Sequence, residues 1–124
     1  KNKYVVNTIG KDELYHLISC ADVLHCENPL KVENDWINDY DLKQGNYDIT
    51  NVDKDIAEII PSPIDMGAVY QRLIRDTMSS KEDYVDGIIR VYNNEICDVI
   101  DNYNCSAFYE PSYVIARAYQ NGGF

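Results

Sequence analysis

The chain has 124 residues, of which 21 are acidic and 11 basic, so its formal net charge is −10 at neutral pH. This length suffices for one domain with its own hydrophobic core, and a hydrophobic content of 45% excludes a wholly disordered chain. The negative charge disfavours direct binding to nucleic acid or to an anionic membrane surface, and no apolar run is long enough to span a bilayer.

The N-terminal part of the sequence predicts a short extended segment followed by a helix. Residues 1–10 favour an extended or irregular conformation, with a brief strand at residues 4–6. Residues 11–26 predict a helix because their apolar side chains recur at the spacing of one helix face. Asp12 and Glu13 fall in its first turn, where the helix dipole favours negative charge.

A second helix is predicted over an acidic stretch that contains the only tryptophan of the chain. Asn28 can cap this helix, and Pro29 suits the first helical position. Trp36 and Tyr40 then fall on one side of the helix, with acidic residues beside them. A loop rich in glycine and asparagine follows, and residues 53–60 predict a short helix.

The second half of the chain predicts three further helices. Ser62 and Asp65 form a capping box that begins the first of them. A similar box at residues 80–83 begins the longest predicted helix, over residues 81–103, whose apolar stripe continues for six turns. The last helix is expected over residues 111–120.

These elements predict a mainly α fold, in which residues 1–124 form a single acidic domain built as a compact bundle of five or six helices. The sequence lacks the alternation of strands and helices that is typical of a parallel sheet. Tyr92 and Ile96 are expected in the core. The four cysteines lack metal-ligand spacing, so we expect reduced, buried thiols in a cytoplasmic protein.

The acidic stretch over residues 33–48 does not fit a calcium-binding loop. If Asp39 takes the first position, Asp41 takes the third, but Lys43 falls at the fifth position, where an EF-hand needs an oxygen ligand. Gln44 then takes the sixth position, where the EF-hand needs glycine. We therefore predict no metal site and no cofactor.

One alternative is a small enzyme, or an enzyme subunit, with a pocket around His16, His25 and Cys20. Glu13 and His16 have the spacing of half a di-iron motif, but the other half is missing. His25 follows His16 by nine residues, which places the two imidazoles on opposite sides of one helix. The sequence contains no nucleophile elbow and no phosphate-binding glycine loop. We therefore predict no catalytic residue, and a helical oligomerisation domain is a further alternative.

The leading hypothesis is a non-catalytic module that binds a basic protein. Carboxylates attract a cationic partner, and aromatic side chains provide contact area. The expected binding residues are Glu33, Asp35, Trp36, Asp39, Tyr40 and Asp41 on the second helix, and Asp83, Asp86, Asp98 and Asp101 along the outer face of the longest helix. Such a surface suits an inhibitor or immunity protein of a basic nuclease, or a phage or mobile-element protein that mimics DNA.

Overall fold

The computed structural model describes residues 1–20, 28–43, 45, 62–102 and 105–123. Within these ranges the protein contains seven α-helices, one short 3₁₀ helix and no strand, which confirms the predicted mainly α fold. The helix predicted over residues 53–60 lies outside the described residues.

The predicted extended N-terminal segment is wrong, because α1 covers Asn2–Ile9. Val5, Val6 and Ile9 share one side of this helix and join an apolar cluster with residues of α2 and α6. Gly10 ends α1 with a φ of 82°, a conformation that glycine adopts without steric cost. The chain thereby turns sharply into α2, which covers Lys11–Ser19.

The acidic helix α4 covers Pro29–Asp39, as the capping signals predict. The side chain of Asn28 accepts a hydrogen bond of 2.9 Å from the backbone N–H of Leu30. Trp36 and Tyr40 are half-buried and pack against the apolar cluster of α1 and α2. The apolar side chains of Leu30 and Ile37 remain exposed, so only part of the expected apolar face of α4 is covered.

The longest of the described helices is α5, which covers Pro63–Thr77 and begins with the predicted capping box. Ser62 and Asp65 bond each other's backbone N–H groups through their side chains. Tyr70 and Leu73 are each only 1% exposed, so the inner face of α5 forms the centre of the larger hydrophobic core.

The continuous helix predicted over residues 81–103 is wrong, because the chain breaks into α6 (Tyr84–Tyr92) and α7 (Ile96–Ile100). The carboxylate of Asp83, rather than Ser80, caps the start of α6. At the break, the side-chain oxygen of Asn94 accepts a hydrogen bond of 2.9 Å from the N–H of Ile96. Such a local bond competes with the helical backbone pattern and ends the helix.

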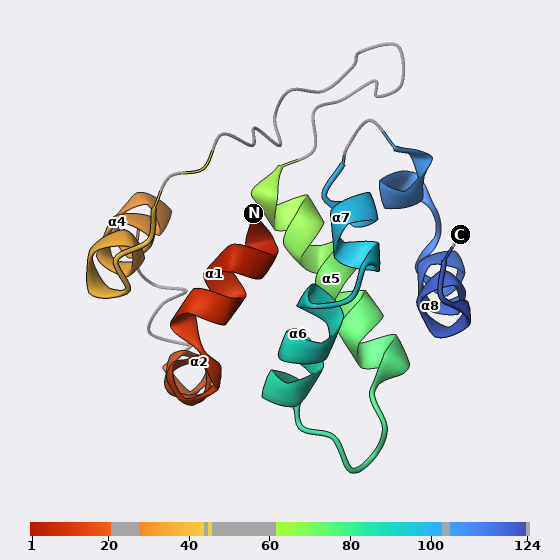
Figure 1. Cartoon of the computed structure of the whole chain (residues 1–124), viewed down its shortest axis with the longest axis horizontal. Coiled ribbons are helices and arrows are strands. Elements are labelled where there is room, and N and C mark those ends of the chain that lie inside the picture. The colour runs from red at the N-terminus through yellow and green to blue at the C-terminus, as the bar shows by residue number, and fades with distance from the viewer. Residues whose placement is uncertain (21–27, 44, 46–61, 103–104, 124) are drawn as a thin grey trace.

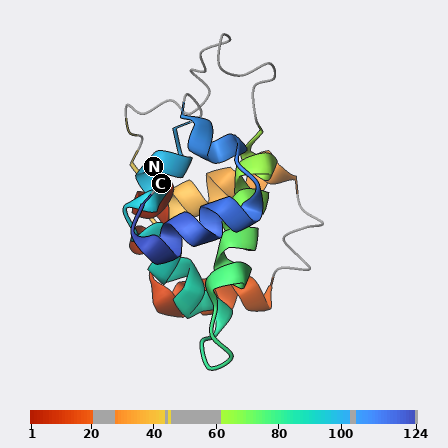
Figure 2. The same cartoon turned by 90° about the vertical axis from the view of Figure 1, so that its right-hand side faces the viewer.

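The C-terminal part consists of a 3₁₀ helix, η1 (Ser106–Tyr109), and the last helix, α8 (Ser112–Asn121). Phe108 and Ile115 bring these elements into the larger core. Ile96 also lies in this core and Tyr92 packs against it half-buried, so the core position is confirmed for Ile96. Figure 2, viewed from the side of α8, shows α8 crossing α5.

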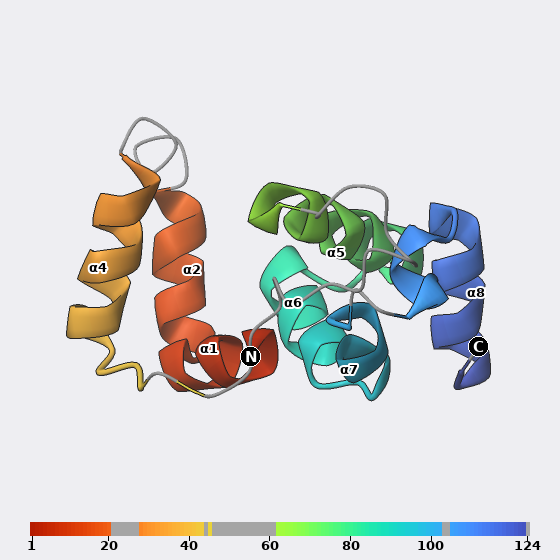
Figure 3. The same cartoon turned by 90° about the horizontal axis from the view of Figure 1, so that it is seen from above.

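The helices form two groups that meet at α6. In Figure 1, α6 lies on the side of α5 that faces away from α8, and α5 packs against both helices. Figure 3 shows α1, α2 and α4 together at one end of the molecule and α5–α8 at the other. Each group has its own cluster of buried apolar side chains, and α1 and α2 both pack against α6.

Candidate functional site

Two of the predicted partner-binding residues, Asp83 and Asp86, bond to side chains of α2, although Asp83 is exposed and Asp86 only half-buried. The carboxylate of Asp83 accepts a hydrogen bond from the hydroxyl of Tyr15 as well as capping α6. Oδ1 of Asp86 lies 2.9 Å from Nζ of Lys11. Because Lys11 and Tyr15 both belong to α2, these two aspartates join α2 to the start of α6.

The other predicted pair on this segment, Asp98 and Asp101, does not share an exposed face. Asp98 is exposed, with Nζ of Lys1 3.8 Å away, but Asp101 is only 2% exposed. Oδ1 of Asp101 accepts hydrogen bonds from the hydroxyl of Tyr70 at 2.6 Å and from Nδ2 of Asn2 at 3.0 Å. Burial raises the pKa of Tyr70, and the charge of Asp101 raises it further, so Tyr70 keeps its proton and acts as a donor.

The predicted row of four aspartates along one helix is therefore wrong. The break between α6 and α7 interrupts the row, and the burial of Asp101 removes its last member. The sequence pattern suggested an exposed position for Asp101 because Asp101 follows Asp98 by three residues. In an uninterrupted helix, this spacing places both residues on the polar side.

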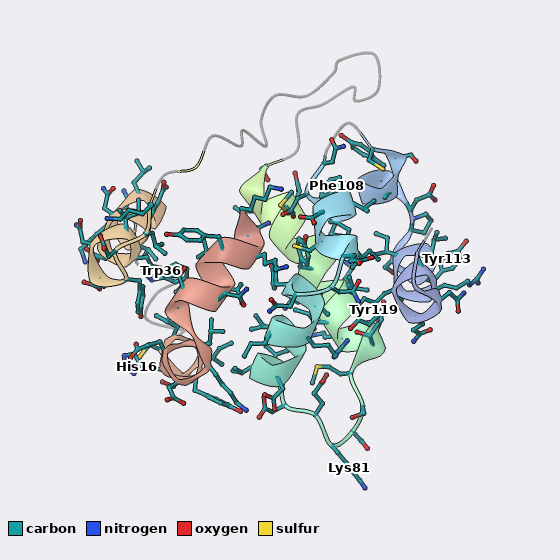
Figure 4. The ribbon with its side chains drawn as sticks, in the orientation of Figure 1. His16, Trp36, Lys81, Phe108, Tyr113 and Tyr119 are labelled. Atoms are coloured by element: carbon teal, nitrogen blue, oxygen red, sulfur yellow. The ribbon has the colours of Figure 1, made fainter. Side chains whose placement is uncertain are left out.

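Four of the six predicted residues on the acidic helix come together at an open groove between α2 and α4. The groove has a volume of about 540 Å³. Its lining residues are Glu13, His16 and Leu17 of α2, Val32, Asp35, Trp36 and Asp39 of α4, and Tyr40. Figure 4 labels His16 on α2 and Trp36 between α4 and the α1–α2 pair.

The groove combines apolar side chains with carboxylates from both helices. The hydroxyl of Tyr40 donates a hydrogen bond of 3.1 Å to Oε2 of Glu13, and this bond ties α4 to α2. Burial and the neighbouring Glu13 raise the pKa of Tyr40, so the hydroxyl remains a donor. Asp35 and Asp39 are exposed on the wall of the groove.

The remaining two predicted residues lie outside the groove lining. Glu33 is exposed on α4. Asp41 follows the helix with a φ of 50°, and its carboxylate lies 2.8 Å from Nζ of Lys43. Their acidic character placed them in the predicted set. Helical spacing puts Glu33 on the side of Trp36 and Tyr40, but the structure leaves it outside the groove lining.

Glu13 and His16 belong to the groove, although the sequence analysis considered them only for metal or catalytic chemistry. Their spacing places them on one face of α2, but nothing in the sequence indicates which helix this face opposes. Among the described residues, no group of three possible metal ligands occurs. His25, the other histidine of the enzyme alternative, lies outside the described residues.

Two of the described cysteines, Cys20 and Cys97, differ in their surroundings. Cys20 is half-buried at the end of α2, and its Sγ lies 3.8 Å from the hydroxyl oxygen of Ser19. Burial raises the pKa of the Cys97 thiol to about 11, so at neutral pH this thiol is protonated and a poor nucleophile.

The described helices also include none that is long and apolar enough to cross a membrane. Comparisons of the chain with protein-family models, with curated proteins and with solved structures give no match.

Proposed function

We propose that the protein is a non-catalytic binding module whose α2–α4 groove accepts a basic segment of a partner protein. The observation that carries this proposal is the convergence of three carboxylates, from Glu13, Asp35 and Asp39, with two aromatic side chains in one groove. The most concrete version is an inhibitor or immunity-type protein that covers the basic surface of a nucleic-acid-handling enzyme.

The chemistry of the groove suits a lysine or arginine side chain. A cation can approach the carboxylates of Asp35 and Asp39 while its aliphatic stem lies along Trp36 or Tyr40. The face of an aromatic ring also attracts a cation directly, most strongly for tryptophan. The groove therefore offers both the charge and the apolar contact that such a side chain needs.

The ion pair that Asp35 forms with Lys31 on α4 is weak. Nζ of Lys31 lies 3.7 Å from Oδ2 of Asp35, and both side chains are more than half exposed. An exposed pair of this kind within one helix contributes only about 0.3–0.5 kcal/mol, so a partner's cation can replace it at little cost.

The overall charge of −10 supports the same partner class, because it accelerates the approach of a basic protein and repels acidic ones. A DNA-like mode of inhibition would now depend on the groove carboxylates, because the row of four aspartates does not exist. The basic patch of a nuclease would then meet Asp35 and Asp39 where it otherwise meets phosphates.

The test is a titration of the protein with a fluorescein-labelled, arginine-rich helical peptide, followed by anisotropy. The groove variant Asp35→Asn/Asp39→Asn is compared with the control Glu33→Gln/Asp41→Asn. Both variants lose two negative charges from the same segment, but the control leaves the groove lining intact. We expect the groove variant to bind about tenfold more weakly, or about 1.4 kcal/mol, and the control to stay close to the wild type.

Trp36 provides a second readout because it is the only tryptophan and lines the groove. Binding of an unlabelled copy of the peptide should change the fluorescence emission of Trp36, and this change should become smaller as the salt concentration rises. Equal weakening in the two variants would mean that only net charge attracts the peptide, and the groove proposal would then fail.

A further inference from the structure

A second hollow lies where the two groups of helices meet. It is a cleft of about 300 Å³ between α1, α5 and α6. Apolar side chains form most of its wall, among them Val5, Ile9, Ile74 and Ile88. The described lining contains no charged side chain, in contrast to the acidic groove between α2 and α4.

The cleft exists because the two hydrophobic clusters do not merge. The smaller cluster has Ile9, Leu14 and Val85 at its centre, and the larger one is built around α5 and α8. Among the half-buried residues that the structure describes, only Ile88 of α6 packs against both. Apolar surface on α1 and on α5 therefore faces the same open space.

Gly67 on α5 lines this cleft, and no packing contact explains its presence. Its φ is not positive, and a Cβ atom built on it would meet no atom within 4 Å. Glycine inside a helix is less stable than alanine. Gly87 on α6 is different, because a Cβ atom there would come within 2.9 Å of Cγ2 of Ile74. A larger residue at position 67 would have space, at a position that lines the cleft.

We propose that this cleft binds an uncharged aromatic small molecule. Its volume falls at the lower end of the range for ligand sites, which are mostly apolar with few polar groups. The rings of Trp36, Tyr70, Tyr84 and Tyr92 lie in its wall, and aromatic rings pack favourably against one another. A charged ligand would lose its hydration without an opposite charge to replace it.

This site is independent of the acidic groove in its chemistry, although the two hollows share Trp36 as a lining residue. An anionic ligand is further disfavoured by the net charge of −10. Toluene and benzoate therefore form a matched pair of probes, because they differ mainly in the carboxylate.

The test is a titration of the full chain with toluene, followed by methyl NMR. We expect saturable shifts at the methyl groups of Val5, Ile9, Ile74 and Ile88, and none at Ile115 on the α8 side of the core. Benzoate should give no saturable shift at these positions. Shifts that do not saturate, or that spread equally to Ile115, would overturn the proposal.

Substitution of Gly67 identifies the site. Gly67→Leu should fill the cleft and weaken toluene binding at least about tenfold, whereas Gly67→Ala adds one methyl group and should keep binding. Unchanged binding to Gly67→Leu would overturn the assignment. If Gly67→Leu fails to fold, Gln71→Phe takes its place, because Gln71 also lines the cleft one turn further along α5. This variant should weaken toluene binding in the same way. Asp35→Asn/Asp39→Asn should bind toluene normally, which separates this test from that of the groove.

Discussion

The side-chain amide of Asn2 donates a hydrogen bond of 3.0 Å to the buried carboxylate of Asp101, which is 99 positions away in the sequence. The same carboxylate accepts the hydroxyl proton of Tyr70 from α5. One acidic side chain thus connects the first helix of the chain, the middle of α5 and the end of α7. It does so at a position where only 2% of the residue is exposed.

Replacement of Asp101 should therefore destabilise the fold. Asp101→Ala leaves the hydroxyl of Tyr70 and the amide of Asn2 without this acceptor, and we expect a loss of about 2–4 kcal/mol in the free energy of unfolding. Asp98→Ala is the control, because Asp98 is exposed, and its effect should stay within about 0.5 kcal/mol. Urea denaturation followed by circular dichroism measures both. Similar values for the two variants would mean that the Asp101 contacts contribute little.

The two helical glycines should respond in opposite directions to the same substitution. Gly87→Ala brings a Cβ atom to within 2.9 Å of Cγ2 of Ile74, so the Ile74 side chain or the helix itself must shift, and we expect a loss of about 1–3 kcal/mol. Gly67→Ala meets no neighbour and should stabilise the protein by roughly 0.5–1 kcal/mol. Thermal unfolding of both variants measures the difference. A gain from Gly87→Ala would contradict the close packing of the two helices.

Stability in acid should depend on the ion pair between Arg90 and Glu82. Nε and Nη2 of Arg90 bond the two carboxylate oxygens of Glu82 at 2.9 and 2.7 Å, and these bonds hold the pKa of Glu82 below its ordinary 4.5. Because the folded-state pKa is the lower one, this stabilisation is present above pH 4.5 and is lost as the pH falls through the folded-state pKa.

The variant Glu82→Gln isolates this contribution from that of the many other acids. It should be less stable than the wild type at neutral pH, and the difference should shrink as the pH falls below 4.5. Urea denaturation at a series of pH values measures this. A difference that stays constant with pH would show that the charge of Glu82 does not stabilise the fold.

The described cysteines should differ in their reaction with thiol reagents. Cys20, Cys97 and Cys105 are free thiols, but Cys97 is buried while the other two are half-buried. Burial raises the pKa of Cys97 to about 11, so little reactive thiolate forms at neutral pH. Iodoacetamide should modify Cys20 and Cys105 in the folded protein and Cys97 only after unfolding, as judged by peptide mass spectrometry. Rapid modification of native Cys97 would contradict its burial.

Two of the three local capping signals predicted a helix start correctly, whereas the box at residues 80–83 did not begin a helix as predicted. Asn28 before α4 and the box of Ser62 and Asp65 before α5 both act as the sequence indicates, because an N-cap depends on residues within a few positions. Tyr70 and Leu73, which are three residues apart on α5, are both buried, as the helical spacing of apolar residues indicates.

The predictions that failed depended on interactions that the spacing of residues along the chain does not reveal. Residues 1–10 have little helical signal of their own, and α1 is stabilised by packing against α2 and α6. The apolar side chains from Val85 to Ile100 follow the spacing of one helix. The side chain of Asn94 nevertheless accepts a hydrogen bond from the backbone N–H of Ile96 and interrupts that helix. The burial of Asp101 likewise depends on partners from α1 and α5.

The groove could be predicted only in part for the same reason. The spacing of Trp36 and Tyr40 placed both on one side of α4, where the structure has them. The identity of the opposite wall required the tertiary arrangement, because Glu13 and His16 come from α2. Acidic residues whose side chains bond within the protein, such as Asp83 and Asp86, look the same in sequence as those facing a partner.

The position of α6 between two separate apolar clusters has a consequence for how the molecule opens. Val85 belongs to one cluster and Val91 to the other. Detachment of α1 and α2 would expose one end of α6 while α5, α7 and α8 still protect the other. Backbone amides of α5 should therefore exchange with deuterium more slowly than those of α1. Exchange should occur in two cooperative units, with the start of α6 belonging to the unit of α1 and its end to the unit of α5.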